Sequence, residues 1–265
     1  MTTAPPSAGS VDPASALRPP APAAPLRIYG VVHLLPLPGG PCPSPGLPAV
    51  LARAAHDAEA LFQGGAHGVV VENFGDAPFP AGRSDPHVVA MMTRAAAEVQ
   101  AHAPGLQLGI NVLRNDAFAA LGIAAAVGAD FVRVNVLSGA SWTDQGLIEG
   151  QAHALLCYRR RLGCEPGGDH PVEIFADVLV KHGVPAGESD PQRAAEEAAK
   201  RAGADALIVT GAGTGQPTDL GVLTAAVRGA GGVPVLVGSG VEPARIAAFQ
   251  EAGARGLIVG TFLHE

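Results

Sequence analysis

The chain has 265 residues and a mass of 26.5 kDa, which fits a single α/β barrel of about 250 residues. Hydrophobic residues make up 48% of it and aromatic residues only 4%, so the core must consist of aliphatic side chains, as in a parallel sheet buried on both faces. A net charge of −7 with only 17 Lys and Arg argues against a nucleic-acid surface.

The first 27 residues are rich in Pro and Ala and lack the basic start and apolar stretch of a secretory signal. We therefore expect a disordered tail over 1–27 and a barrel domain over 28–265. The three cysteines show no CxxC spacing, which favours a reducing cytoplasm over a disulfide framework or a zinc site. No stretch approaches the roughly 20 apolar residues that cross a bilayer, and the basic run at 159–161 is interpreted as a solvated helix face.

From residue 28 onward, short β-branched runs bounded by Gly, Pro, Asn or Asp alternate with amphipathic helical runs. The predicted strands lie at 28–33, 67–72, 106–111, 130–135, 172–177, 205–210, 234–238 and 256–260. The predicted helices lie at 49–63, 86–101, 115–127, 144–162, 191–201, 218–228 and 243–252. Five of the turns back into a strand contain glycine, which accepts the left-handed conformation that ends a helix. Eight such units predict a closed (β/α)8 barrel.

An open, doubly wound sheet is the alternative fold. It would be expected to carry a glycine-rich dinucleotide fingerprint after its first strand. Here that strand ends in His33-Leu34-Leu35-Pro36 instead.

The chain stops at Glu265, directly after the last predicted strand, so we expect it to lack the eighth helix. The outer face of that strand, with apolar residues at 257–259, would then lie bare. Either the reading frame is truncated, or the N-terminal segment or a second subunit is expected to cover this face, because bare apolar rows favour association; a homo-oligomer is predicted.

Polar residues gather at the carboxyl-terminal strand ends, where (β/α)8 barrels place their active sites. Carboxylates that converge there suit general acid or base chemistry or a Mg2+ site. Histidine transfers protons near neutral pH, and Lys181 is either an anion anchor or, if burial depresses its pKa, an imine-forming amine. The candidate catalytic residues are His33, Glu72, Asp144, Asp177 and Lys181. The candidate substrate-binding residues are Asn73, Asp76, Asn111, Arg114, Asn115, Arg133, Asn135 and His182.

Side-chain alternation along the fourth and fifth predicted strands places Arg133, Asn135, Glu173 and Asp177 toward the barrel interior. A buried arginine requires a partner, and Glu72, Glu173 and Asp177 are the candidates. These charges form either a structural ion network or part of an active site.

The last three strands run into glycine-rich loops. Backbone amides in such loops often hold phosphate in barrels, although glycines in turns also occur for structural reasons alone. The predicted phosphate-binding residues are Thr210, Gly211, Gly238, Ser239, Gly240, Gly260 and Thr261. A small phosphorylated molecule is therefore the expected partner.

The polar runs Glu-Asn-Phe-Gly-Asp at 72–76 and Asn-Val-Leu-Arg-Asn-Asp at 111–116 are specific, as is Ala-Asp-Val-Leu-Val-Lys-His at 176–182. With these runs the chain resembles the BtpA family, also called the BtpA/SgcQ family, over residues 28–263. The resemblance implies a phosphate-binding barrel, with a namesake implicated in photosystem I biogenesis in cyanobacteria and members outside photosynthesis. Family members normally continue past the last Gly-Thr into a final helix.

Two functions remain open at this point. The first is an enzyme acting on a sugar phosphate or a nucleotide-like metabolite, as a hydrolase, lyase or isomerase. The second is a non-catalytic assembly or stability factor, as in photosystem I biogenesis. The many converging polar groups favour the enzyme, because a scaffold has no need for them.

Overall fold

The computed structural model describes residues 25–211 and 213–263. The first 24 residues of the predicted tail lie outside the described residues. Arg27, the last residue of the predicted tail, is described and belongs to the first strand, which begins one residue earlier than expected.

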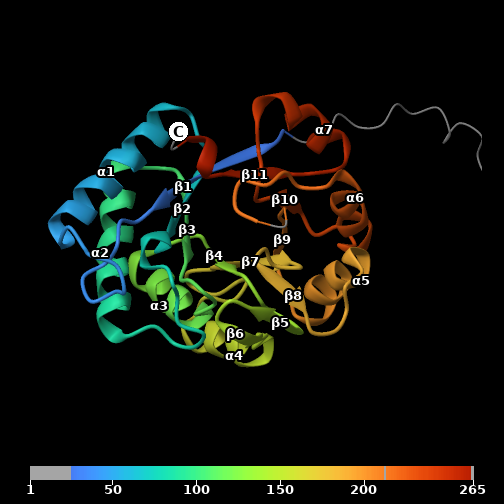
Figure 1. The fold of residues 1–265 in the computed structure, drawn as a ribbon, viewed down its shortest axis with the longest axis horizontal. Coiled ribbons are helices and arrows are strands. Elements are labelled where there is room, and N and C mark those ends of the chain that lie inside the picture. Colours follow the sequence, from blue (N-terminus) through green and yellow to red (C-terminus); the bar gives the residue numbers. More distant parts are fainter. Residues whose placement is uncertain (1–24, 212, 264–265) are drawn as a thin grey trace, which may run out of the picture.

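Eight parallel strands close into a barrel in the described part of the chain, which confirms the predicted (β/α)8 fold (Figure 1). Around the barrel they follow one another as β1, β2, β3, β4, β7, β9, β10 and β11, and β11 pairs with β1 to close it. The strands are β1 (Arg27–His33), β2 (Gly68–Glu72), β3 (Gln107–Asn111), β4 (Phe131–Val134), β7 (Glu173–Val178), β9 (Ala206–Val209), β10 (Val235–Val237) and β11 (Gly256–Val259).

The helices lie outside the ring of strands (Figure 1). They are α1 (Leu47–Gln63), α2 (Pro86–His102), α3 (Ala117–Val127), α4 (Ala152–Arg161), α5 (Pro191–Glu196), α6 (Leu220–Gly229) and α7 (Ile246–Glu251). Short 3-10 helices are η2 (Phe74–Asp76), η4 (Pro243–Arg245) and η5 (Thr261–Leu263), and η3 (Glu197–Arg201) is a π-helical segment that continues α5. Three helices begin at an aspartate whose side chain accepts backbone N–H groups, namely Asp116, Asp190 and Asp219. Glycines in the left-handed region follow several helices, as Gly128 does at φ 75°.

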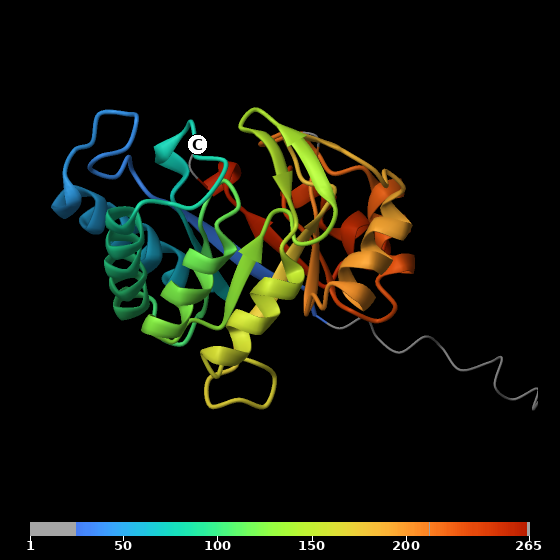
Figure 2. The same cartoon turned by 90° about the horizontal axis from the view of Figure 1, so that it is seen from below.

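The predicted helix at 144–162 is wrong in its first half. Residues there form an antiparallel hairpin of β5 (Ala140–Thr143) and β6 (Gly146–Glu149), and α4 begins only at Ala152. A third strand, β8 (Gly183–Pro185), pairs with the other edge of β5. Figure 2 shows this small sheet at the same end of the barrel as the loop after β2. It therefore stands beside the carboxyl-terminal mouth.

Two apolar layers confirm the predicted alternation. Val132 and Val134 of β4, and Ile174 and Ala176 of β7, belong to the large cluster between sheet and helices. The barrel interior holds a second cluster made of Tyr29, Val31, Val70, Phe131, Phe175, Ala206, Ile208, Leu236 and Ile258.

Three aromatic rings fill the interior cluster at the level of the strand starts. Phe131 and Phe175 stack with ring centres 4.2 Å apart, and Tyr29 meets Phe131 edge-on at 5.5 Å. Glycines of the neighbouring strands make room for them: a Cβ on Gly109 would lie 2.2 Å from the Phe131 ring, and one on Gly68 would lie 2.5 Å from Tyr29. The three rings thus contact one another inside the barrel.

The last strand is not bare on its outer face, contrary to expectation. Leu257 is fully buried and Val259 is 9% exposed, and both join the cluster that contains Ala58 of α1 and Phe249 of α7. The flanking helices therefore already cover much of this face.

Arg159 corrects the interpretation of the basic run as a solvated face. Its side chain is buried, its Nη1 lies 2.9 Å from Asp205 Oδ2, and its Nε donates to the Cys164 carbonyl. Arg160 and Arg161 are exposed as expected.

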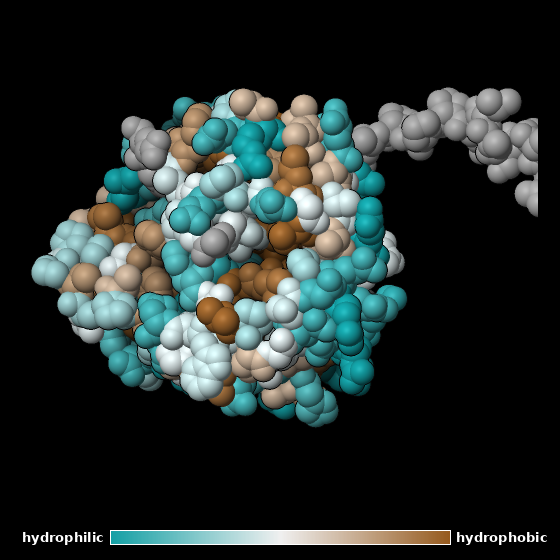
Figure 3. Space-filling model, turned by 45° about the vertical axis from the view of Figure 1, so that its right-hand side comes forward, coloured by the Kyte–Doolittle hydropathy of each residue, from teal (hydrophilic) through white to brown (hydrophobic). Residues whose placement is uncertain are grey.

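Trp142, Leu147 and Val184 form an exposed apolar row across the small sheet, because Trp142 pairs with both other residues. On the face shown in Figure 3, hydrophilic and intermediate residues predominate, and hydrophobic ones gather in small patches and in a central hollow. None of the described helices is both long and apolar enough to traverse a membrane.

Candidate active site

Arg133 lies at the carboxyl-terminal mouth of the barrel, between the carboxylates of Glu72 and Asp177. Its side chain is 3% exposed, and its Nε and Nη2 donate hydrogen bonds of 2.9 and 3.1 Å to the two carboxylate oxygens of Asp177. Its Nη1 lies 3.9 Å from Glu72 Oε2. The interior position of Arg133 is thus confirmed, and it has a carboxylate on either side.

Glu173 is not a partner of Arg133, contrary to expectation. It begins β7 and lies at the opposite, amino-terminal mouth, where it lines a cavity with Arg27 and Arg255. Alternation placed its side chain on the correct face of the sheet but not at the correct depth.

Two asparagines extend the charged network. Asn111 Nδ2 donates to Glu72 Oε2 at 3.0 Å, and Asn135 Nδ2 donates to Asp177 Oδ2 at 2.9 Å. The register of the sheet explains the first contact, because Glu72 pairs with Asn111 on one side and with His33 on the other. Parallel pairing therefore brings three predicted site residues to one level.

Several buried polar atoms at this mouth have no hydrogen-bond partner among the described residues. They are Asn111 Oδ1, Asn135 Oδ1, Thr210 Oγ1 and Arg114 Nε. Leaving such an atom unsatisfied costs about 1–3 kcal/mol. A polar ligand seated at the mouth would supply the missing partners.

The pKa values of Glu72 and Lys181 both lie below their ordinary values. Burial raises the pKa of Glu72, but the charges of Arg133, Lys181 and His33 outweigh it, so this pKa lies below its usual value. Burial lowers the pKa of Lys181, and Arg133 lowers it further, against the opposing effect of Glu72 and Asp177. The site thus combines an ionised carboxylate with an amine that loses its proton more readily than an ordinary lysine.

The segment that carries Lys181 has an unusual backbone. Leu179 and His182 both have positive φ, at 54° and 56°, although neither is glycine. Contacts hold the segment in place: Arg114 donates from Nη2 to the Lys181 carbonyl, and His182 Nε2 lies 3.0 Å from Thr214 Oγ1. Burial and then the charge of Lys181 lower the pKa of His182.

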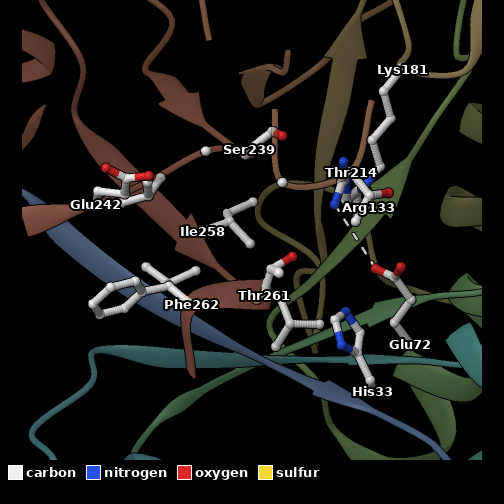
Figure 4. A pocket seen from close by; sticks show the side chains of 17 residues that line it. His33, Glu72, Arg133, Lys181, Thr214, Ser239, Glu242, Ile258, Thr261 and Phe262 are labelled. Atoms are coloured by element: carbon white, nitrogen blue, oxygen red, sulfur yellow. Dashed lines mark ion pairs between the residues drawn. The ribbon is translucent and has the colours of Figure 1, made fainter. Parts of the chain in front are cut away.

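A cavity of about 110 Å³ joins this charged group to the glycine-rich loops (Figure 4). Figure 4 shows His33, Glu72, Arg133 and Lys181 along one side, with Ser239, Glu242 and Phe262 across from them. The remaining lining includes Thr214, Gly215, Gly238, Gly240, Gly260 and Thr261. The cavity therefore brings together most of the predicted catalytic and phosphate-binding residues.

The glycines of these loops differ in what they do. A Cβ on Gly211 would lie 2.3 Å from the Gln216 carbonyl, and Gly240 has φ +59° with its Cβ position 2.3 Å from Pro217. Gly211 therefore lets the loop after β9 fold back on itself, and Gly240 lets the loop after β10 pack against it. Ser239 acts with them, because its hydroxyl donates to the carbonyls of Gly213 and Gln216. In contrast, a Cβ on Gly260 would meet only side chains, the His33 ring at 3.3 Å and Val31 at 3.7 Å.

Three predicted substrate-binding residues tie loops together. Asp76 accepts hydrogen bonds from the Leu37 amide and from Asn73 Nδ2, and Asn73 Oδ1 accepts one from the Leu113 amide. Asn115 exchanges two hydrogen bonds with the backbone of Val136. These side chains shape the mouth and do not line the cavity.

His33 and Asp144 occupy different settings. The His33 ring stacks on Phe74 at 4.5 Å and lines the cavity. Asp144 lies exposed in the turn between β5 and β6, outside the cavity lining, where its charge still acts on Arg114 and His182.

The Mg2+ site considered from the sequence stays a prediction. Glu72 and Asp177 converge on Arg133, whose guanidinium lies between them. In the described part of the chain no group of three His, Cys, Asp or Glu is placed to hold a metal ion.

Sequence reasoning missed Thr214, Glu242 and Phe262 as cavity residues. Thr214 lies inside a glycine-rich run that was itself noticed. Nothing in the sequence around Glu242 or Phe262 distinguishes them from ordinary loop residues.

Comparison of the sequence with known proteins identifies a family and several relatives. The chain matches the model of the BtpA family over residues 26–265. It is 48% identical over 236 residues to a protein of Synechocystis sp. named photosystem I biogenesis protein BtpA, with 89% of this chain and 79% of the relative covered.

Solved structures with low sequence identity share the barrel fold. A 2,3-dimethylmalate lyase of the PEP mutase/isocitrate lyase superfamily has a TM-score of 0.56 at 14% identity, over 89% of this chain and 76% of the other. A 3-hexulose-6-phosphate synthase has a TM-score of 0.54 at 18% identity, over 89% and 90%.

Proposed function

The chain belongs to the BtpA family, and on that premise we propose that it is an enzyme acting on a small phosphorylated metabolite at the carboxyl-terminal mouth of its barrel. One observation carries the proposal. A single cavity joins the ionised carboxylate of Glu72, the buried guanidinium of Arg133 and the partly buried amine of Lys181 to loops rich in glycine. The charged side chains that would carry out the chemistry and the backbone amides that would bind an anion therefore line the same cavity.

In this proposal the phosphate group lies against the loops after β10 and β11. Gly238, Gly240 and Gly260 allow an anion to approach the backbone closely. Thr210 and Gly211 support the loop after β9. Fold neighbours offer precedent, because 3-hexulose-6-phosphate synthase is named for a sugar phosphate.

Glu72 serves as the acid or base on the part of the substrate away from the phosphate. Its carboxylate lines the cavity, and Arg133 keeps it ionised. Asp177 is bound to Arg133 and Asn135 at once, so its role is to orient the guanidinium.

Thermal unfolding with inorganic phosphate or sugar phosphates tests the anion site. A ligand that binds only the folded state raises its stability by about 2.7 kcal/mol at 100 times its Kd. We expect the melting temperature to rise with phosphate and not with chloride at equal ionic strength. No rise at millimolar ligand and low salt would refute phosphate binding.

Turnover is tested with a panel of sugar phosphates and nucleotides, scored for hydrolysis, isomerisation and carbon–carbon cleavage. We expect activity in the wild type and its loss in Glu72→Gln. Unchanged turnover in Glu72→Gln would move the chemistry to another residue.

A second candidate is a non-catalytic assembly factor. The observation in its favour is the 48% identity to the Synechocystis photosystem I biogenesis protein. Complementation of a photosystem I-deficient strain separates the two functions: an assembly factor would rescue with Glu72→Gln as well as with the wild type, whereas an enzyme would not.

We also propose a cytoplasmic location and a homo-oligomer. Cys42, Cys157 and Cys164 are free thiols, as a reducing compartment permits. The exposed row Trp142, Leu147 and Val184 offers an apolar surface for a second subunit. Sedimentation as a monomer at micromolar concentration would refute the oligomer.

A further inference from the structure

We infer that Lys181 forms an imine with its substrate, so that the metabolite is a phosphorylated aldehyde or ketone. The inference rests on the proposed function, because it takes the phosphate-binding cavity as given. It adds a covalent role for one residue and a chemical class for the substrate.

Lys181 is one of only two lysines in the chain, and the two differ in every relevant respect. Lys200 lies on the surface in η3, its side chain is 58% exposed, and its Nζ is 2.8 Å from Glu196 Oε1. Lys181 is mostly buried and lines the cavity. Its amine has no hydrogen bond or ion pair with any residue that the structure describes.

An amine in this setting is suited to attack a carbonyl carbon. Only the neutral amine is nucleophilic, and lysine is activated by burial or by a neighbouring cation. Arg133 and Arg114 are both close enough to oppose the ammonium charge. The positive φ values at Leu179 and His182 fix the loop that points this amine at the cavity.

Glu72 supplies the proton transfers that imine formation requires. Nζ attacks the carbonyl carbon, and Glu72 moves one proton from nitrogen to the carbonyl oxygen, which gives a carbinolamine. A proton from solvent, delivered through Glu72, then lets that oxygen leave as water. The product is a protonated imine, whose positive charge lies near the carboxylates of Glu72 and Asp177.

Reductive trapping tests the inference directly. The protein is incubated at pH 7 with dihydroxyacetone phosphate and sodium cyanoborohydride, and the adduct is located by peptide mass mapping. We expect the adduct on Lys181, with a preference over Lys200 of about tenfold for each unit by which burial depresses the pKa of Lys181. Equal labelling of Lys200, or no labelling of Lys181, would overturn the inference.

Two variants serve as controls. Lys181→Arg keeps the positive charge but cannot form an imine, so its adduct should vanish while thermal stabilisation by glycerol 3-phosphate persists. Lys200→Arg should trap as the wild type does. An adduct that survives Lys181→Arg in full would assign the chemistry elsewhere.

Glycerol 3-phosphate separates failure of this inference from failure of the proposed function, because it carries phosphate but no carbonyl group. If it stabilises the protein and dihydroxyacetone phosphate still gives no adduct, the phosphate site stands and the imine is refuted. If dihydroxyacetone without phosphate labels Lys181 equally well, the imine stands and the phosphate site is refuted. If glycerol 3-phosphate does not stabilise the protein and dihydroxyacetone phosphate gives no adduct, both the phosphate site and the imine are refuted.

Discussion

Replacing Arg133 with methionine removes the charge between two buried carboxylates and keeps a side chain of similar length. Asp177 would lose two hydrogen bonds, of 2.9 and 3.1 Å, and Glu72 would lose an ion pair at 3.9 Å. Asp177 would keep the amide of Asn135, and Glu72 would keep the amide of Asn111 and the charges of Lys181 and His33. Breaking a buried pair in this way costs about 3–5 kcal/mol, a large part of the roughly 5–15 kcal/mol that stabilises a domain.

Urea unfolding measures this cost, with far-UV circular dichroism as the signal. Fluorescence is a poor choice, because the single tryptophan, Trp142, is already 57% exposed in the folded protein. Arg160→Met is the matched control on an exposed face of α4, with an expected change within about 0.5 kcal/mol. Adding Asp177→Asn and Glu72→Gln to Arg133→Met should recover stability, because neutral amides tolerate burial better. Identical midpoints for Arg133→Met and Arg160→Met would show that the guanidinium is not buried between these carboxylates.

Four further predictions concern other parts of the structure. Arg159→Met should cost about 1.5–3 kcal/mol in the same urea titration, because it loses a charge-assisted contact with Asp205; a silent change would place Arg159 in solvent after all. The stabilisation from ionised Glu72 is complete above its ordinary pKa of 4.5 and is lost as pH falls through its lowered folded-state pKa. The difference in free energy of unfolding between the wild type and Glu72→Gln should therefore narrow on acidification. A difference that stays constant with pH would contradict this. Gly240→Ala should cost about 1–3 kcal/mol and weaken the melting response to phosphate, whereas Gly187→Ala, with nothing within 4 Å of its Cβ position, should do neither. Glu242→Gln should strengthen phosphate binding measured by calorimetry, because a carboxylate among the glycine loops repels the anion, and a weaker affinity would place the anion elsewhere.

The sequence predicted the barrel because strand and helix periodicities differ and glycines mark the turns between them. It did not predict the hairpin at 140–149, because β5 is held on one side by β6 and on the other by β8, a strand far along the chain. Arg159 was misplaced for a similar reason: its partner Asp205 lies beyond the next barrel strand. Tertiary pairing of this kind leaves no local signal.

The sequence indicated which residues gather at the candidate site but not the role of each one. Strand ends locate Glu72, Asp177 and Arg133 at one mouth, and parallel pairing does bring them together. The same reasoning cannot separate a polar residue that meets a ligand from one that ties loops, as Asn73 and Asp76 do. It also fixes which face a strand residue occupies but not its depth, which is why Glu173 was expected beside Arg133.

The fit between aromatic rings and glycines inside the barrel has a consequence for how this family can change. An alanine at position 109 cannot coexist with phenylalanine at 131, since the added methyl would lie 2.2 Å from the ring. The first substitution becomes acceptable only after the second site has lost bulk, so the two positions are expected to covary across relatives, with a smaller residue at 131 wherever 109 carries a side chain. Gly68 is more strictly required, because a Cβ there would also lie 2.7 Å from the Gln107 carbonyl oxygen, a backbone contact that no substitution of Tyr29 relieves. Mutational paths through the barrel interior are therefore ordered: bulk must be lost at position 131 before it is gained at position 109.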